Sequence, residues 1–213
     1  MFKNLFEKKN IAVVLGGLPG SGKSFIANQF ASHGFLIICK DTIRYEMAKK
    51  IYGNKPESLF DEELQKMGKY VHPILKDMVE SFFAKTNIFS NIDEKIKNKE
   101  HNAFAKEYVS SIDYNKYKSI VFDATHFNKP QRKAMIDNIN GRMEIYCVYI
   151  NKSLDESYEG VKRRVASIVE IYNNEEIHGR DVPSSVLEDM KKYESLPKKY
   201  EGFKEVYIIE NKF

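Results

Sequence analysis

The sequence predicts a single α/β domain in which helices cover both faces of a five-stranded, mainly parallel sheet. Three observations favour this class. Five short apolar runs end at turn residues, helical patterns fill the segments between them, and no change of composition marks a linker within the 213 residues. A chain of this length is long enough to bury one substantial core.

The five apolar runs are rich in β-branched and aromatic residues, as strands are. The first three show little alternation of polar with apolar side chains, which is typical of strands buried on both faces. The expected strands are residues 11–16, 35–39, 119–123, 144–150 and 206–210.

Helical patterns lie between and after these strands. In the longest, apolar residues recur at steps of three and four, and Pro73 is expected to kink or split the helix. The polar, charge-dense segment 87–100 indicates a surface loop or a short exposed helix, and residues 52–118 together form a helical insert. The expected helices are residues 23–31, 42–51, 61–84, 130–138, 155–172 and 183–193.

Composition argues against several classes of protein. Lys and Arg total 34 against 30 Asp and Glu, so a formal charge of +4 is too small for bulk attraction to nucleic acid. Cys39 and Cys147 are too few for a disulfide framework or a cysteine zinc site. No apolar run suits a membrane span, and the N-terminus lacks a signal-peptide pattern. We therefore expect a cytoplasmic protein with no membrane partner.

The segment GLPGSGKS matches the pattern G-x-x-x-x-G-K-[ST] directly after the first strand and at the start of a helix. Its glycines let successive N–H groups converge on a triphosphate, and the helix N-terminus adds positive potential. Lys23 would reach the β- and γ-phosphates, and the Ser24 hydroxyl would ligate Mg²⁺. A glycine-rich connecting turn is the alternative, but the strand-loop-helix context favours ATP bound with Mg²⁺. The expected nucleotide-binding residues are Gly17, Pro19, Gly20, Ser21, Gly22, Lys23 and Ser24.

The second strand is followed by Lys-Asp-Thr-Ile-Arg, which places Asp41 and Arg44 on one helical face beyond the carboxyl end of a strand. A carboxylate beside a guanidinium suits a phosphoryl acceptor that carries a hydroxyl and a phosphate. Asp41 would take the hydroxyl proton, and Arg44 would hold the phosphate. The alternative makes Asp41 a helix N-cap and Arg44 a solvated charge.

The third strand ends at Asp123, where P-loop proteins often place an acid that holds or orients Mg²⁺. Asp123 could instead pair with Arg44. The polar side chains that follow form either a binding wall for the acceptor or a solvated loop that caps a helix. These candidate substrate-binding residues are Thr125, His126, Asn128 and Arg132.

Basic residues recur late in the chain, at Arg163 and Arg164 on an expected helix and at Arg180 before another. Residues 171–178 between them are expected to be a polar loop, and residues 160–183 a helical lid. A lid arginine would add positive charge to the transferring phosphoryl group, and a closed lid would exclude water. We expect Arg180 and one of Arg163 and Arg164 to contact ATP. The alternative is a solvated basic face.

These motifs together resemble the kinase module of polynucleotide 5′-kinases of the phage and bacterial RNA-repair type. GLPGSGKS, KDTIR, FDATHFNKPQR, the pair RR and GRDVP occur in that family's order, from residue 11 to about 195. The resemblance implies a P-loop kinase fold with ATP and Mg²⁺. It also implies Asp41 as the general base, Arg44 on the phosphate beside the acceptor 5′-hydroxyl, Asp123 as the acid of the third motif and Arg180 on ATP. The chain departs from the family in its third motif, which reads Ala-Thr-His where the family usually has Asp-Thr-Asn. Its helical insert is also larger than expected.

Three functions follow as hypotheses. The first is transfer of the γ-phosphate of ATP to the 5′-hydroxyl end of a DNA or RNA strand, as in nucleic-acid repair. The second is phosphorylation of a small molecule such as a nucleoside, sugar or antibiotic, because the loop, base and lid would look alike there. The third is a nucleotide-dependent regulatory module. The amphipathic insert suits a wall for a polynucleotide or a subunit interface equally.

Overall fold

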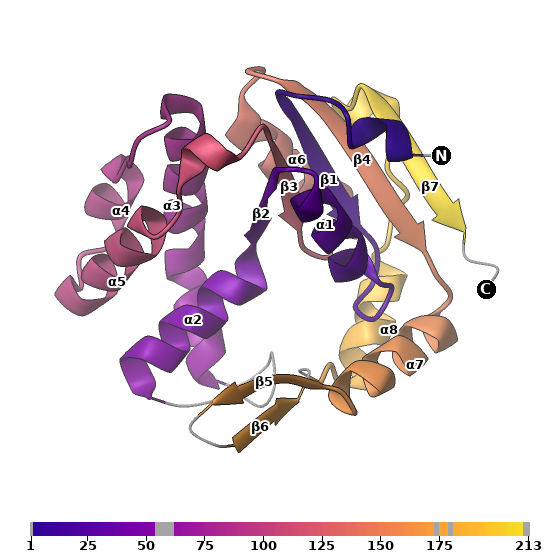
Figure 1. Ribbon diagram of the computed structural model, residues 1–213. Helices are drawn as coiled ribbons and strands as arrows, with labels where there is room; N and C mark the ends of the chain where they lie inside the picture. Colours follow the sequence, from indigo (N-terminus) through magenta and orange to yellow (C-terminus); the bar gives the residue numbers. More distant parts are fainter. Residues whose placement is uncertain (1, 54–61, 173–174, 179–180, 211–213) are drawn as a thin grey trace. The chain divides into compact units, whose positions relative to one another are not determined.

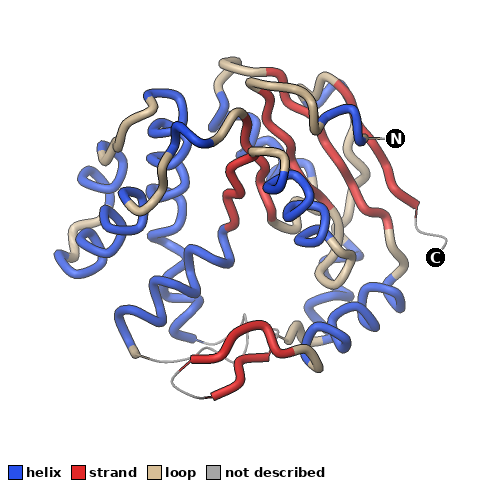
Figure 2. Tube along the Cα trace, in the orientation of Figure 1, coloured by secondary structure: helices blue, strands red, loops and turns tan. Residues whose placement is uncertain are grey.

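The computed structural model describes residues 2–53, 62–172, 175–178 and 181–210 (Figures 1 and 2). Internal contacts divide the chain into two compact units, Met1–Ile37 with Lys118–Phe213, and Ile38–Tyr117. Nearly all of the expected insert falls in the second unit, and the single domain stays a prediction. Among the described residues, no helix is long and apolar enough to span a membrane.

A five-stranded parallel sheet organises the first unit (Figure 1). The strand order is β2-β3-β1-β4-β7, so β1 lies at the centre. All five expected strands are confirmed, and the sheet is wholly rather than mainly parallel. Their bounds are Ile11–Gly16 (β1), Phe35–Cys39 (β2), Ser119–Asp123 (β3), Glu144–Asn151 (β4) and Glu205–Glu210 (β7).

Strand β1 pairs on its two sides with strands that lie far away in the sequence. Ala12 pairs with Ile120 of β3, and Ile11 pairs with Glu144 of β4. Every residue of β1 and β3 is buried, whereas β7 at the edge is only partly buried. Because the pairs are parallel, the carboxyl ends of β1 and β3 lie at the same edge of the sheet.

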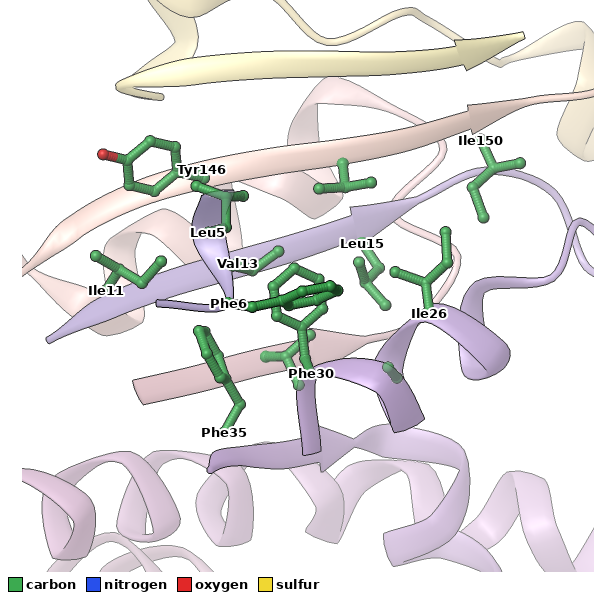
Figure 3. Packing of buried hydrophobic residues seen from close by; sticks show 13 residues of the cluster. Leu5, Phe6, Ile11, Val13, Leu15, Ile26, Phe30, Phe35, Tyr146 and Ile150 are labelled. Atoms are coloured by element: carbon green, nitrogen blue, oxygen red, sulfur yellow. The ribbon is translucent and has the colours of Figure 1, made fainter. Parts of the chain in front are cut away.

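Helix α1 packs on one face of this sheet through an aromatic and aliphatic core (Figure 3). Phe30 of α1 lies 4.9 Å from both Phe6 and Phe35, measured between ring centroids. Cys147 of β4 is buried, and this burial raises the pKa of its thiol to about 12, which leaves the thiol neutral at physiological pH. The helices of the first unit are Lys3–Leu5 (η1), Lys23–Ser32 (α1), Lys129–Ile139 (α6), Leu154–Val165 (α7), Ser184–Lys192 (α8) and Lys199–Glu201 (η3).

The second unit is helical. Pro73 lies inside α3, yet the helix continues to Ala84, so the expected split does not occur. Val71 and Ile74 on either side of the proline are buried, and this apolar face outweighs one lost backbone hydrogen bond. Its helices are Lys40–Tyr52 (α2), Glu62–Ala84 (α3), Ser90–Lys95 (α4), Lys99–Ser110 (α5) and Tyr114–Lys116 (η2).

Segment 87–100 contains the short helix α4 and the start of α5, a helix that the sequence analysis missed. The buried Asp77 carboxylate accepts hydrogen bonds from the N–H groups of Asn91 (3.1 Å) and Ile92 (2.8 Å), which fixes the start of α4. Asn98 caps α5 by accepting a hydrogen bond of 3.0 Å from the N–H of His101. Polar contacts therefore order a segment that was expected to be a surface loop or a short exposed helix, and the short helix is present as α4.

The expected helix 155–172 and loop 171–178 are wrong in part. Helix α7 ends at Val165, and Ile168–Tyr172 (β5) pairs antiparallel with Glu175–His178 (β6) as a hairpin (Figure 2). The run Ile-Val-Glu-Ile-Tyr is rich in β-branched residues, which favour a strand over a helix.

Candidate functional site

The loop after β1 has the backbone of a phosphate cradle. Gly17, Gly20 and Gly22 have φ values of 130°, 78° and 100°, a region that other residues enter only with strain. Helix α1 begins directly after them at Lys23. The chain therefore turns sharply from the buried end of β1 into a helix N-terminus, which is the geometry that anions favour.

Lys23 lies over this loop. Its Nζ donates a hydrogen bond to the carbonyl oxygen of Leu18 (2.6 Å) and lies 3.3 Å from Ser21 Oγ, and the side chain is 8% exposed. Ser24 follows in the first turn of α1 and is exposed. The Lys23 ammonium group is thus held over the glycines, and the Ser24 hydroxyl follows it in the sequence.

The connection after β3 is tied to the same loop. The N–H of Gly17 donates to the carbonyl oxygen of Thr125 (2.8 Å), and His126 Nδ1 lies 2.7 Å from the carbonyl oxygen of Leu15. Because a carbonyl only accepts, Nδ1 is the protonated ring nitrogen. His126 is buried and adopts a φ of 37°. These two residues hold the entry of the phosphate loop, while their contact with an acceptor stays a prediction.

Asp123 ends β3, one residue beyond the pair Val14–Phe122, and its side chain is buried. It therefore lies at the sheet edge where the phosphate loop begins. Ser24 and Asp123 both belong to the first unit and supply the hydroxyl and carboxylate oxygens that Mg²⁺ accepts. Among the described residues no group of three or more His, Cys, Asp or Glu side chains is placed to hold a metal ion. That donor set suits an ion held mainly by nucleotide phosphates.

Asn128 and Arg132 have structural partners. Asn128 is the N-cap of α6 and accepts a hydrogen bond of 3.1 Å from the N–H of Gln131. The fully buried Arg132 forms a two-pronged ion pair with Glu201 (2.8 and 2.9 Å) and donates to the carbonyl oxygen of Ser195 (2.8 Å). These contacts are those of a helix cap and a core ion pair, so they do not support direct binding of the acceptor.

Helix α7 touches the phosphate loop backbone to backbone. A Cβ placed on Gly160 of α7 would lie 2.0 Å from the carbonyl oxygen of Gly20, and one on Gly20 would lie 2.1 Å from the carbonyl oxygen of Ser157. The sequence analysis missed this role for Gly160, although an isolated glycine inside a helical pattern is a signal for close approach.

The two candidate arginines of α7 differ in environment. Arg163 is exposed and helps Lys162 to lower the pKa of the Glu159 carboxyl. Arg164 is partly buried, and its Nε and Nη2 atoms are shielded from solvent. Burial makes Arg164 the better candidate for a contact with ATP. Arg180 lies outside the described residues, so its expected contact with ATP stays a prediction.

We expect Arg164→Ala to lower phosphoryl transfer by about tenfold or more, because a charge near the transferring group stabilises the transition state. Lys162→Ala, which removes an exposed partner of Glu159 at 2.8 Å, should leave the rate within about twofold. Steady-state rates at saturating ATP would measure both. A larger loss for Arg163→Ala than for Arg164→Ala would reverse the assignment.

Asp41 and Arg44 belong to the second unit. Both lie near the start of α2, and an Arg44 guanidinium nitrogen forms an ion pair with an Asp41 carboxylate oxygen. The N-cap of α2 is Cys39, so Asp41 is not the cap. Both side chains are partly exposed, at 33% for Asp41 and 22% for Arg44. A carboxylate and a guanidinium thus lie together, available to solvent, directly after β2.

A family model described as an AAA domain (AAA_33) matches residues 13–197, from β1 to just beyond α8. The chain belongs to this AAA domain family. AAA_33 is a P-loop kinase family, and the fold described above is of the P-loop kinase type. P-loop kinases are typically phosphotransferases and generally use ATP and Mg²⁺.

Solved structures resemble this AAA domain over most of its length. A gluconokinase from Sinorhizobium meliloti 1021 is 14% identical, with a TM-score of 0.48, over 97% of this chain and 86% of that one. TT1252 from Thermus thermophilus is 14% identical, with a TM-score of 0.41, over 97% of this chain and 91% of that one. No curated protein matches the sequence significantly.

Proposed function

We propose that this AAA domain is an ATP-dependent kinase that transfers the γ-phosphate to a hydroxyl group of a small-molecule acceptor. The observation that carries the proposal is the phosphate loop, with its three left-handed glycines and the buried Lys23 Nζ on the carbonyl of Leu18. Arginine and lysine around such a loop stabilise charge on a transferring phosphoryl group.

In the proposed reaction the acceptor oxygen attacks the γ-phosphorus in line. The bond from that phosphorus to the oxygen bridging the β-phosphate breaks, and ADP leaves. Asp41 takes the proton of the acceptor hydroxyl. Lys23 holds the β- and γ-phosphates, and Arg164 together with Arg180 offsets their charge.

Mg²⁺ would be held by Ser24 and Asp123, and it would neutralise charge on the phosphates. The buried Asp123 carboxylate and the exposed Ser24 hydroxyl fit that task. Thr125 and His126 keep the loop in place through their contacts with Gly17 and Leu15.

The charge distribution of the second unit supports a small acceptor. A polynucleotide follows a row of unpaired cations, but several lysines here already lie beside acids. Lys50 lies 3.7 Å from Glu107, and Lys106 lies 2.6 Å from Asp93. The formal charge of the whole chain is only +4. Positive charge is thus local, which suits a compact ligand.

The 5′-hydroxyl end of a DNA or RNA strand is the second candidate acceptor. The observation that favours it is the pairing of Asp41 with Arg44 three residues later. In the resembling polynucleotide kinases that pair meets the hydroxyl and its neighbouring phosphate.

A transfer assay tests both candidates. The protein is incubated with Mg²⁺, ATP labelled in the γ-phosphate, and in separate reactions nucleosides, sugars, sugar acids, aminoglycosides or a 5′-hydroxyl oligonucleotide, with Lys23→Met as the inactive control. Label on a small molecule is the expected result. Label on the oligonucleotide alone would establish the second candidate. ATP binding without transfer to any acceptor would contradict a kinase and favour a regulatory module.

A further inference from the structure

Two pairs of basic residues lie on two packed helices of the second unit. Lys40 and Arg44 lie four residues apart at the start of α2, and His72 and Lys76 lie four residues apart on α3. Residues at this spacing share one helical face. Helices α2 and α3 lie side by side (Figure 1). We call these four residues the basic cluster.

The four groups of the basic cluster act on one another. Burial, and next the charge of Arg44, lower the pKa of Lys40, while Asp41 opposes the change. Burial, and next the charges of Lys76 and Lys40, lower the pKa of His72. Positive charge on α2 therefore acts on a residue of α3. The acid beside these groups, Asp41, already pairs with Arg44.

The repulsion between these positive charges is unfavourable unless an anion binds beside them. Lys40 is the first residue of α2, where the helix dipole disfavours a cation. Within the described part of the chain, neither Lys40 nor Lys76 forms a hydrogen bond or a close ion pair, in contrast to Lys50 with Glu107 at 3.7 Å. Lys76 acts at longer range on Glu94, whose pKa is lowered chiefly by Lys95. Lys40, Arg44 and Lys76 are partly buried, whereas His72 is exposed. Charged groups that shift one another's pKa mark candidate binding sites.

We propose that Lys40, Arg44, His72 and Lys76 bind an anionic group of the acceptor, a phosphate or a carboxylate. The guanidinium and ammonium groups would donate charge-assisted hydrogen bonds, and His72 would add a ring N–H. Asp41 lies in the same first turn as Lys40, so one small molecule would present its hydroxyl to Asp41 and its anionic group to the basic cluster. The binding of an anion by the basic cluster does not depend on the proposed kinase function. The assignment of that anion to the acceptor does rest on it.

Binding is tested without ATP by following the ring resonances of His72 by NMR. Inorganic phosphate, and separately gluconate as a carboxylate probe, should raise the pKa of His72 by about one unit, because an anion offsets Lys40 and Lys76. His101, whose lowered pKa reflects burial and then Glu100 and Lys69, is the internal reference. Lys40→Met should reduce the shift at His72, whereas Lys50→Met on the same helix should not. An unchanged pKa of His72 with both probes would overturn the anion site.

Kinetics test the assignment to the acceptor. Lys40→Met and Lys76→Met should each raise KM for an anionic acceptor by about tenfold, with KM for a neutral acceptor and for ATP unchanged within about twofold. Sugar acids against neutral sugars, and nucleoside 3′-monophosphates against nucleosides, distinguish carboxylate from phosphate. Equal effects on charged and neutral acceptors would overturn the assignment. A shift at His72 without transfer to any acceptor would leave the anion site standing and contradict the kinase instead.

Discussion

Asp41→Asn should lower kcat for transfer by about a hundredfold or more, because an amide cannot take the acceptor proton. The affinity for ATP should stay within about threefold, since the nucleotide is assigned to residues 17–24, Arg164 and Arg180 and the change preserves the shape of the Asp41 side chain. Single-turnover transfer and a separate ATP-binding titration measure the two quantities. An equal loss of binding and turnover would assign Asp41 a structural role.

The matched control is Asp113→Asn. Asp113 also pairs with a basic residue three positions later, Lys116, at 3.5 Å, and it also belongs to the second unit. The amide oxygen can still accept the hydrogen bond from the N–H of Asn115 that the carboxylate accepts now, at 3.2 Å. Transfer by this variant should stay within about twofold of the original protein. A comparable loss in both variants would mean that folding, not proton transfer, is affected.

Gly160→Ala should weaken ATP binding by about tenfold or more and lower the free energy of unfolding by about 1–3 kcal/mol. The added methyl group would lie 2.0 Å from the carbonyl oxygen of Gly20, a backbone atom that moves only with the phosphate loop. ATP titration and thermal unfolding measure the two effects. Unchanged affinity would show that the loop does not need its contact with α7.

Gly68→Ala is the matched control for the helical glycine. Gly68 lies inside α3, and a Cβ there would have nothing within 4 Å. Since alanine favours helix over glycine by about 1 kcal/mol, this variant should be as stable as the original protein or more so. ATP affinity should not change. A loss of ATP affinity in this variant would indicate that any substitution of a helical glycine disturbs the protein.

Strands and the phosphate loop were predictable because their signals are local. Five apolar runs between turn residues located all five strands of the sheet. Gly17, Gly22 and Lys23 stand at fixed spacing between a strand and a helix, so the cradle followed from the motif. Helix α5 was missed although His101, Phe104, Ala105 and Val109 are buried at steps of three and four, because polar neighbours dominate its composition.

Contacts between distant residues were not predictable. Arg132 was expected to belong either to a binding wall or to a solvated region that caps a helix, but its partner Glu201 lies in another element far along the chain. The close approach of Gly160 to Gly20 likewise depends on how α7 packs. The lowering of the pKa of His72, first by burial and then by Lys76 and Lys40, involves a residue of α2 acting on α3, which spacing within either helix cannot reveal. A single sequence shows the spacing of apolar and polar residues within one element. The three contacts above depend instead on how separate elements pack in the folded protein.

The central place of β1 also governs how the protein folds during synthesis. The strand that carries the phosphate loop is made before its partners, which include Ile120 and Glu144, more than 100 residues later in the chain. Pairing of such distant segments is slow, and nascent chains expose apolar strands until it occurs. We therefore expect nucleotide binding only after β3 and β4 have been made, and ATP would stabilise the paired sheet rather than guide its formation.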